Sequence, residues 1–260
     1  MASSLDGTGV AFSNGTSQAS AWIGGRGQIF TSVGANTFTV PAGVTAIKVT
    51  VIGGGASGGA PANNNGLRCG AGGGAGGTAI KFITGLTAGS TITATVGAAG
   101  AAVTASGTAV AGNAGGTSSF GAYCSATGGS GGSAASTNNA GGSGGTGSSG
   151  DINLTGGSGS WGFVYLSSCY ATWAASAGGG TMSHASVTNM TSTTATGSVA
   201  MLGNSGAGMF GYGGAFLSPT ATTTTPSATG YGNGGAGTLA ALGGTMTSGA
   251  GSSGIIIVEW

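Results

Sequence analysis

Residues able to carry out acid–base or nucleophilic chemistry are scarce in this chain. Its only carboxylates are Asp6, Asp151 and Glu259, and its only histidine is His184. Catalysis by paired carboxylates requires two such groups to converge on one bond, yet these three belong to different segments. Ser183 precedes His184, but no Gly-x-Ser-x-Gly turn stands between a strand and a helix, the setting of a hydrolase nucleophile. We therefore expect no enzymatic activity.

The patterns for metal and nucleotide binding are equally weak. Cys69, Cys124 and Cys169 are widely separated and odd in number, which argues against a disulfide framework and against a zinc site. We expect these thiols to be reduced and structural. Glycine-rich stretches match G-x-G-x-x-G in several registers, but that motif binds phosphate only between a strand and a helix. The sequence predicts no cofactor and no bound metal.

The charge of the chain excludes several classes of partner. Four basic and three acidic side chains give a net charge of +1, so there is no basic stripe for phosphate and we expect no nucleic-acid partner. No window approaches roughly 18 apolar residues, so we expect no membrane insertion. Met1–Asp6 lacks the basic start and apolar run of a secretory signal, so we expect synthesis in the cytoplasm without a signal peptide.

Glycine is the dominant residue, at 63 of 260 positions. Glycine loses the most backbone freedom on folding and brings no side chain to bury, so long glycine runs need another source of stability. An extended helix with three residues per turn and glycine at every third position presents a bare face to its neighbours. Gly141, Gly144, Gly147 and Gly150 have this spacing. The sequence thus predicts polyglycine II-type helices that hydrogen-bond through their backbones, spanning roughly 30 Å over residues 141–150.

Apolar residues predict a second kind of structure, an antiparallel β-sandwich. In 46–52, Ile47, Val49 and Val51 alternate with Lys48 and Thr50, which indicates one buried and one solvated face. The apolar run 254–260 is typical of a central strand, and we expect it to pair with strands near residue 50. Almost no α-helix is expected. The other predicted strands are 28–33, 37–40, 78–83 and 91–96.

These signals divide the chain into three predicted domains. Residues 1–27, with the hairpin dipeptides Asp6-Gly7 and Asn14-Gly15, form two short strands that must pack on another chain or domain. Residues 28–124, completed by 251–260, form the sandwich scaffold. Residues 125–250 form the glycine-rich region with distal aromatic and Thr-rich loops. Trp22 and Trp260 are expected in the scaffold core.

Aromatic residues between the glycine runs are the candidates for recognition. Aromatic side chains on loops held by a rigid scaffold bury large areas at low entropic cost, and Trp or Tyr faces also stack on sugars. The same rings are equally suited to capping the glycine helices or sealing a trimer axis. The candidates are Trp161, Phe163, Tyr165, Tyr170, Trp173, Met209, Phe210, Tyr212 and Phe216.

Several segments together resemble the glycine-rich tail-fibre and receptor-binding proteins, or adhesins, of tailed bacteriophages and prophages. The resemblance rests on four separated places that span nearly the whole chain, namely 10–18, 38–55, 115–129 and 254–260. It implies a virion fibre protein, usually a homotrimer, whose distal part meets the host surface. In the similar tail-fibre-tip adhesins of T-even-like phages, loops that connect polyglycine helices choose the receptor.

The resemblance implies a function without chemistry. We expect a phage tail-fibre protein at the distal tip that binds an outer-membrane protein or polysaccharide during adsorption. Residues 1–27 are expected to attach it to other tail-fibre or baseplate proteins, and it would leave the cell by lysis within the virion. The alternative from the residues is a self-assembling glycine-rich subunit of a filament or sheath. A third hypothesis is ice binding by Thr-rich patches such as Thr222–Thr225.

Overall fold

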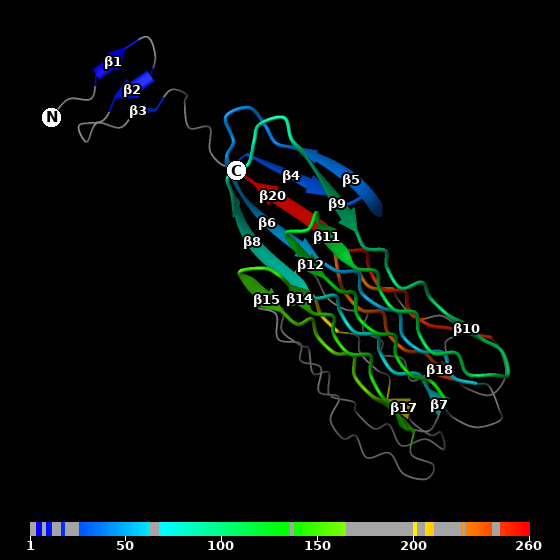
Figure 1. Cartoon of the computed structure of the whole chain (residues 1–260). Helices are drawn as coiled ribbons and strands as arrows, with labels where there is room; N and C mark the ends of the chain where they lie inside the picture. The colour runs from blue at the N-terminus through cyan, green and yellow to red at the C-terminus, as the bar shows by residue number, and fades with distance from the viewer. Residues whose placement is uncertain are drawn as a thin grey trace.

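A β-sandwich and a bundle of extended segments follow one another along the long axis of the molecule (Figure 1). The computed structural model contains no α-helix in the part of the chain that it describes, and its strands pair antiparallel, as predicted. The structure describes residues 4–6, 9–11, 17–18, 26–62, 68–135, 138–164, 200–201, 206–210, 225, 227–240 and 245–260.

The first sheet of the sandwich holds the C-terminal strand near its centre. Its order is β15-β8-β6-β20-β4. In β20, Ile256 lies opposite Val51 on one side and Phe30 on the other. The predicted pairing of the C-terminal run with residues 46–52 is therefore confirmed. The strands are β15 (Ile152–Leu154), β8 (Thr78–Thr84), β6 (Ala46–Ile52), β20 (Ile255–Glu259) and β4 (Gly27–Phe30).

The second sheet covers the inner face of the first, and the apolar core lies between them. Phe38 and Phe120 are fully buried there, with ring centroids 5.7 Å apart. Trp260 is partly buried and packs on Phe38 at 5.7 Å, as expected of a scaffold residue. Trp22 lies outside the described residues. The sheet order is β14 (Gly147–Ser148), β12 (Cys124–Ala126), β11 (Ser118–Phe120), β9 (Thr91–Val96) and β5 (Gly34–Thr39).

The alternation in β6 explains how this strand is oriented. Ile47, Val49 and Val51 point into the core, and Lys48 points outward to an ion pair with Glu259 at 2.8 Å. Thr50 departs from the expected solvated face because it is only 5% exposed. Its register partners on the neighbouring strands are isoleucines, Ile257 and Ile80.

A small three-stranded sheet precedes the sandwich. It consists of β1 (Ser4–Asp6), β2 (Gly9–Ala11) and β3 (Ser17–Gln18) in sequential antiparallel order. Two strands were predicted in this segment, and the third arises because Ser17 and Gln18 pair with β2. The division of the chain at residues 27 and 124 stays a prediction. Glycine segments and sandwich strands alternate along the chain from residue 53 onward.

The extended segments bond to one another through their backbones with a period of three. The N–H groups of segment 53–60 point to a new neighbour at each residue and return to the first neighbour after three. Such a period is the one expected of a polyglycine II helix with three residues per turn. The donors to segment 71–77 are Gly53, Ala56 and Gly59. The donors to segment 110–116 are Gly54, Ser57 and Ala60. The third neighbour is segment 249–252, where Ser252 accepts from Gly55 and Gly249 accepts from Gly58.

Segment 53–60 is surrounded by other segments on all sides. Its carbonyl groups accept hydrogen bonds from three further segments, 97–100, 127–132 and 232–238. Segment 70–77 is enclosed in the same way, because its backbone bonds to segments 53–59, 127–133, 142–145, 157–160, 206 and 232–238. The two central helices thus have hexagonal surroundings, and every N–H group of 53–60 and 70–77 donates to a backbone carbonyl of a neighbouring segment, without help from side chains.

Close approach of these backbones is what requires glycine. A Cβ atom added to Gly53, Gly54 or Gly55 would lie closer than 3.0 Å to a backbone carbonyl oxygen of a different neighbour in each case, namely Thr127, Ala98 and Asn233. Three consecutive glycines therefore serve three contacts in three directions. The predicted polyglycine packing is confirmed, and it replaces an apolar interior in this part of the molecule.

Candidate functional site

The bundle end that lies away from the sandwich, called the distal end, is built from short paired strands (Figure 1). Outgoing and returning segments pair there as β7 with β18 and β10 with β19, and β16 pairs with β13 on one side and β17 on the other. The C-terminus lies at the end of the sandwich that faces away from the bundle (Figure 1). The bounds are β7 (Arg68–Cys69), β10 (Thr104–Ala105), β13 (Asn138–Asn139), β16 (Gly162–Val164), β17 (Ala200–Met201), β18 (Leu239–Ala240) and β19 (Met246–Thr247).

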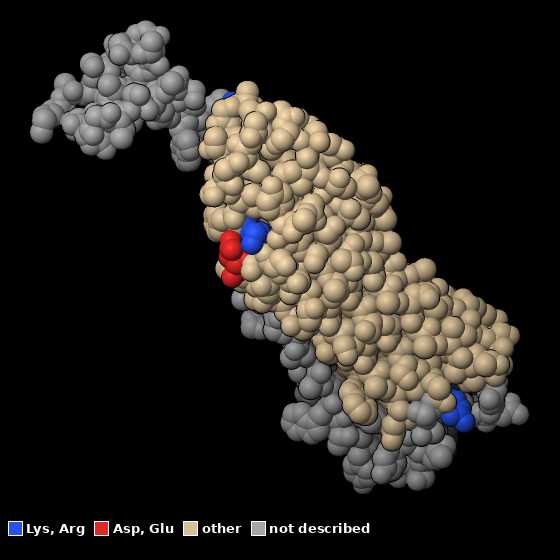
Figure 2. All heavy atoms as spheres, in the orientation of Figure 1, with Lys and Arg blue, Asp and Glu red and all other residues tan. Residues whose placement is uncertain are grey.

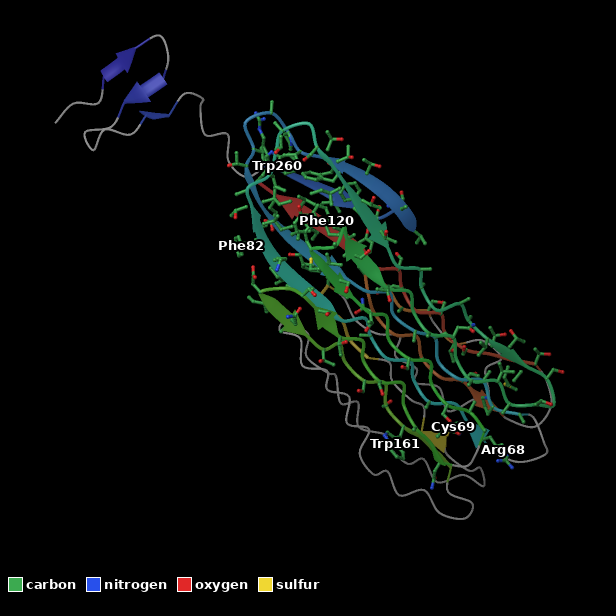
Figure 3. All side chains as sticks on the ribbon, viewed as in Figure 1. Arg68, Cys69, Phe82, Phe120, Trp161 and Trp260 are labelled. Atoms are coloured by element: carbon green, nitrogen blue, oxygen red, sulfur yellow. The ribbon has the colours of Figure 1, made fainter. Side chains whose placement is uncertain are left out.

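Trp161 is the large aromatic side chain that the described part of the distal end exposes most. Its side chain is 54% exposed, and it lies near Arg68 and Cys69 in the view of Figure 3. Thr155, Ser158 and Trp161 follow one another at intervals of three residues along the same helix, and all three are exposed. The period of three therefore directs this ring away from the bundle. Of the predicted recognition residues, Trp161 has the expected exposure and place.

The other recognition candidates are placed differently. Phe163 lies in β16, opposite Asn138 and Met201. Met209 is partly buried, and Phe210 is 42% exposed. Phe210 pairs with Tyr231, and the next residue after Tyr231, Gly232, lies against the Ile52 side chain of β6. The pair Met209 and Phe210 is thus at the sandwich end of the bundle, not at the distal end as expected. Tyr165, Tyr170, Trp173, Tyr212 and Phe216 lie outside the described residues, as does His184.

A regular array of small side chains covers one face of the bundle. Segments 111–117, 127–133 and 140–146 lie side by side, joined by bonds such as Ser130 N–H to the Ser143 carbonyl and Gly115 N–H to the Gly129 carbonyl. Every third residue of each segment points outward, and the outward residues of the three segments are in register. This small-residue array consists of Thr117, Thr127 and Thr146; Ala114, Ser130 and Ser143; and Ala111, Ser133 and Ala140.

The sequence repeat explains this array. In 114–116, 127–132 and 140–145, the outward position takes Ser, Thr or Ala, and the two positions that follow take glycine because they face neighbouring helices. In segment 140–147, a Cβ on Gly141 or Gly144 would collide with the carbonyl of Gly159 or Gly156, and a Cβ on Gly142 with that of Ser130. The sequence spacing predicts one bare row and a helix over 141–150, whereas the structure shows two bare rows and a shorter helix, because residues 147–148 form β14 and the chain bends at Ser149, whose φ is 59°.

Charged groups are distributed unevenly along the molecule. The two ion pairs seen among the described residues, Lys48 with Glu259 at 2.8 Å and Lys81 with Asp151 at 3.8 Å, belong to the sandwich. Figure 2 shows charges of both signs there and a single basic group at the distal end. Figure 3 identifies Arg68 at that end. Sequence reasoning missed Arg68, although its isolation is visible in the sequence as a lone charge between Lys48 and Lys81.

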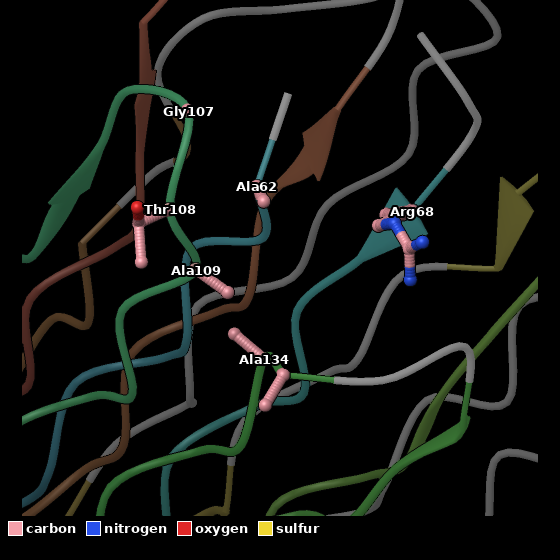
Figure 4. A pocket seen from close by; sticks show the side chains of 7 residues that line it. Ala62, Arg68, Gly107, Thr108, Ala109 and Ala134 are labelled. Atoms are coloured by element: carbon pink, nitrogen blue, oxygen red, sulfur yellow. The ribbon is translucent and has the colours of Figure 1, made fainter. Parts of the chain in front are cut away.

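A hollow of about 390 Å³ opens beside Arg68 (Figure 4). Among the residues that the structure describes, the other walls carry small side chains, and the guanidinium is the one charged group. Walls of this kind leave space beside the cation and supply no competing carboxylate. The lining residues are Ala62, Arg68, Gly107, Thr108, Ala109, Ala134 and Ala135.

Cys69 and Cys124 are free and buried, in line with a structural role. Burial raises the pKa of the Cys69 thiol to about 12. Burial also raises the pKa of Cys124 to about 11, with Lys81 opposing and Asp151 reinforcing that shift. Because the thiolate is the nucleophile, both groups are nearly inert at neutral pH. Cys169 lies outside the described residues.

Comparison with known proteins identifies the family. Within the described residues, no group of three or more His, Cys, Asp or Glu side chains is placed to hold a metal, and no helix has the length and apolarity to cross a bilayer. A family model described as a glycine-rich domain matches residues 31–260. The chain belongs to this glycine-rich domain family. The match includes both the sandwich and the bundle, so the glycine-rich domain contains both parts. No curated protein matches the sequence.

Proposed function

We propose that this glycine-rich domain is the receptor-binding tip of a bacteriophage tail fibre. It binds an outer-membrane protein or polysaccharide on the bacterial surface during adsorption. The observation that carries the proposal is an exposed aromatic ring, Trp161, at the far end of a bundle whose central backbones are bonded on all sides. A rigid support lowers the entropy that a recognition loop loses on binding.

The proposed mechanism is attachment without bond making or breaking. Residues 1–27 join the domain to other tail-fibre or baseplate proteins, and the domain works as a homotrimer in the virion. Three tips held together raise the effective concentration of each binding site, so that weak single contacts give lasting adsorption. The surface, which carries few charges, suits a polar partner such as carbohydrate.

Two exposed aromatic residues at opposite ends of the molecule allow a matched test. Trp161 is 54% exposed at the distal end, and Phe82 is 64% exposed on the outer face of β8 in the sandwich. Fluorescently labelled protein is incubated with a panel of bacterial strains and measured by flow cytometry. We expect Trp161→Ala to weaken binding to susceptible cells by about tenfold or more, as for a recognition hot spot. Phe82→Ala should bind like the wild type.

Competition with the virus links the binding to adsorption. Wild-type protein and Phe82→Ala should block phage adsorption to the same cells, and Trp161→Ala should block it poorly. Wild-type protein that coats no strain, or equal loss in both variants, contradicts the receptor-binding proposal.

A second candidate function is a self-assembling subunit of a filament or sheath. The small-residue array favours it, because uncharged side chains in register allow two such faces to approach closely. Light scattering and negative-stain imaging separate the two functions. A tip gives discrete oligomers, whereas a filament subunit grows with concentration. Ser130→Lys together with Ser143→Lys would stop such growth by charge repulsion but leave distal binding unchanged.

A further inference from the structure

Arg68 is a cation that stands apart from the paired acidic side chains of the described residues. Asp151 and Glu259 are paired with Lys81 and Lys48, and the third acidic residue, Asp6, belongs to β1 at the other end of the sequence. Residues 7–150 and 152–258 contain no acidic side chain. The part of the chain that the structure describes shows no ion pair for Arg68.

The backbone holds Arg68 in a fixed place. Arg68 lies opposite Ala240 in the β7–β18 pair. The carbonyl of the next residue, Cys69, accepts a 2.7 Å hydrogen bond from the Asn139 side-chain amide, and the Gly70 N–H donates to the Thr238 carbonyl at 2.7 Å. The guanidinium therefore extends from a positioned strand, so that less freedom is lost when it binds a ligand.

The surroundings of Arg68 suit one class of ligand. The side chain is partly buried, and the adjacent hollow of about 390 Å³ is lined otherwise by Ala, Gly and Thr. A guanidinium is always charged and presents its donors in a planar fork that matches the two oxygens of a carboxylate or phosphate. Neutral sugar hydroxyls do not supply the charge that a partly desolvated cation requires.

We propose that the hollow beside Arg68 binds an oxyanion, a phosphate or carboxylate group carried on a sugar of the bacterial surface. The proposal deepens the receptor-binding function and rests on it for the source of the ligand. The guanidinium pairs with the oxyanion, and the small walls of the hollow admit the attached sugar ring. Residues Thr108 and Ala134 line the opposite side of the hollow (Figure 4).

Binding of small probes tests the site without any cell. The full chain, labelled with ¹⁵N, is titrated with glucose 1-phosphate, glucuronate and neutral methyl glucoside while NMR signals of the Arg68 side chain and of the Thr108 and Ala134 amides are followed. We expect saturable shifts with one or both anionic sugars and none with methyl glucoside. The sugar that binds more tightly, glucose 1-phosphate or glucuronate, shows whether the site prefers phosphate or carboxylate. Added salt should weaken the binding, because the interaction is ionic.

Two variants and a matched control complete the test. Arg68→Gln should weaken anion binding by about tenfold to a hundredfold, the range for losing hydrogen bonds to a charged group. Arg26→Gln removes the same charge at the sandwich end and should bind like the wild type. Ala135→Leu keeps the charge but narrows the hollow from an exposed lining position, and it should also weaken binding. Equal urea midpoints for all variants show that the fold is intact.

The outcomes separate this inference from the proposed function. An absence of saturable shifts in the wild type, or the same shifts in Arg68→Gln, overturns the oxyanion site whether or not the protein coats cells. Protein that binds the anionic sugars through Arg68 but coats no strain keeps the site and contradicts the receptor-binding function.

Discussion

Replacing one central glycine tests whether the bundle is held by backbone contact. Gly74 lies in segment 70–77, and a Cβ at this position would come closer than 3.0 Å to the carbonyl oxygens of Ser143 and Gly142. These are main-chain atoms that no rotamer change can move. Gly74→Ala therefore requires segments 70–77 and 140–146 to separate.

The cost follows from the bonds that join these two segments. The Gly142 N–H donates to the Gly72 carbonyl at 2.9 Å, and the Gly145 N–H donates to the Ala75 carbonyl at 2.8 Å. Breaking a bond between buried groups costs about 1–3 kcal/mol, so losing both costs about 2–6 kcal/mol. Alanine reduces the entropy of the unfolded chain, which offsets about 0.4–1 kcal/mol. We expect Gly74→Ala to lower the free energy of unfolding by about 1–6 kcal/mol.

Urea denaturation and hydrogen exchange measure this effect. Ser143→Ala is the control, because its side chain is exposed on the facing segment, and it should change stability by less than about 0.5 kcal/mol. In Gly74→Ala, the amides of Gly142 and Gly145 should also lose protection from exchange. A Gly74→Ala protein with wild-type stability and protected amides would refute the packing argument.

Two further predictions concern buried side chains. Ile256→Ala should lower the free energy of unfolding, measured by urea denaturation, by about 2–5 kcal/mol, because Ile256 is fully buried between the sheets. Its neighbour Ile257 is only partly buried, so Ile257→Ala should lower that free energy clearly less. Equal losses in the two variants would contradict the core assignment. Burial raises the pKa of Cys69 from 9.0 to about 12, so above pH 9 the unfolded chain loses this proton while the folded chain keeps it. The free energy of unfolding should therefore fall by up to about 1.4 kcal/mol per pH unit between pH 9 and 12. Cys69→Ala should remove this contribution to the pH dependence.

The sandwich was predictable because its signals are local. Alternation in 46–52 and the apolar run 254–260 follow from burial on one or both faces of a strand, and neighbouring residues suffice to reveal them. The antiparallel pairing of β6 with β20 confirmed this part. The polyglycine packing was predictable for a related reason, since glycine at every third position has few uses other than close backbone approach.

The candidate site was only partly predictable. The sequence singles out Trp161 because a large ring beside glycine runs is conspicuous; the structure exposes this ring, and its role in recognition stays a prediction. Met209 and Phe210 looked equivalent in sequence, yet they lie near the sandwich, because segment 206–208 returns from the distal end. Which end of a helix a loop occupies depends on chain direction, which composition does not record.

The sequence by itself determined that the described part of this chain is all-β and that its glycines bring backbones together, and the absence of catalytic chemistry stays a prediction from its few charges. Only the tertiary structure decided which segments are neighbours, since each peptide group in a glycine run offers the same donor and acceptor to any partner. It also decided that Ala62, Thr108 and Ala134 meet beside Arg68. Such small side chains carry no recognisable signal in the sequence. They form one site only because folding brings turns from distant parts of the chain to the same end of the bundle.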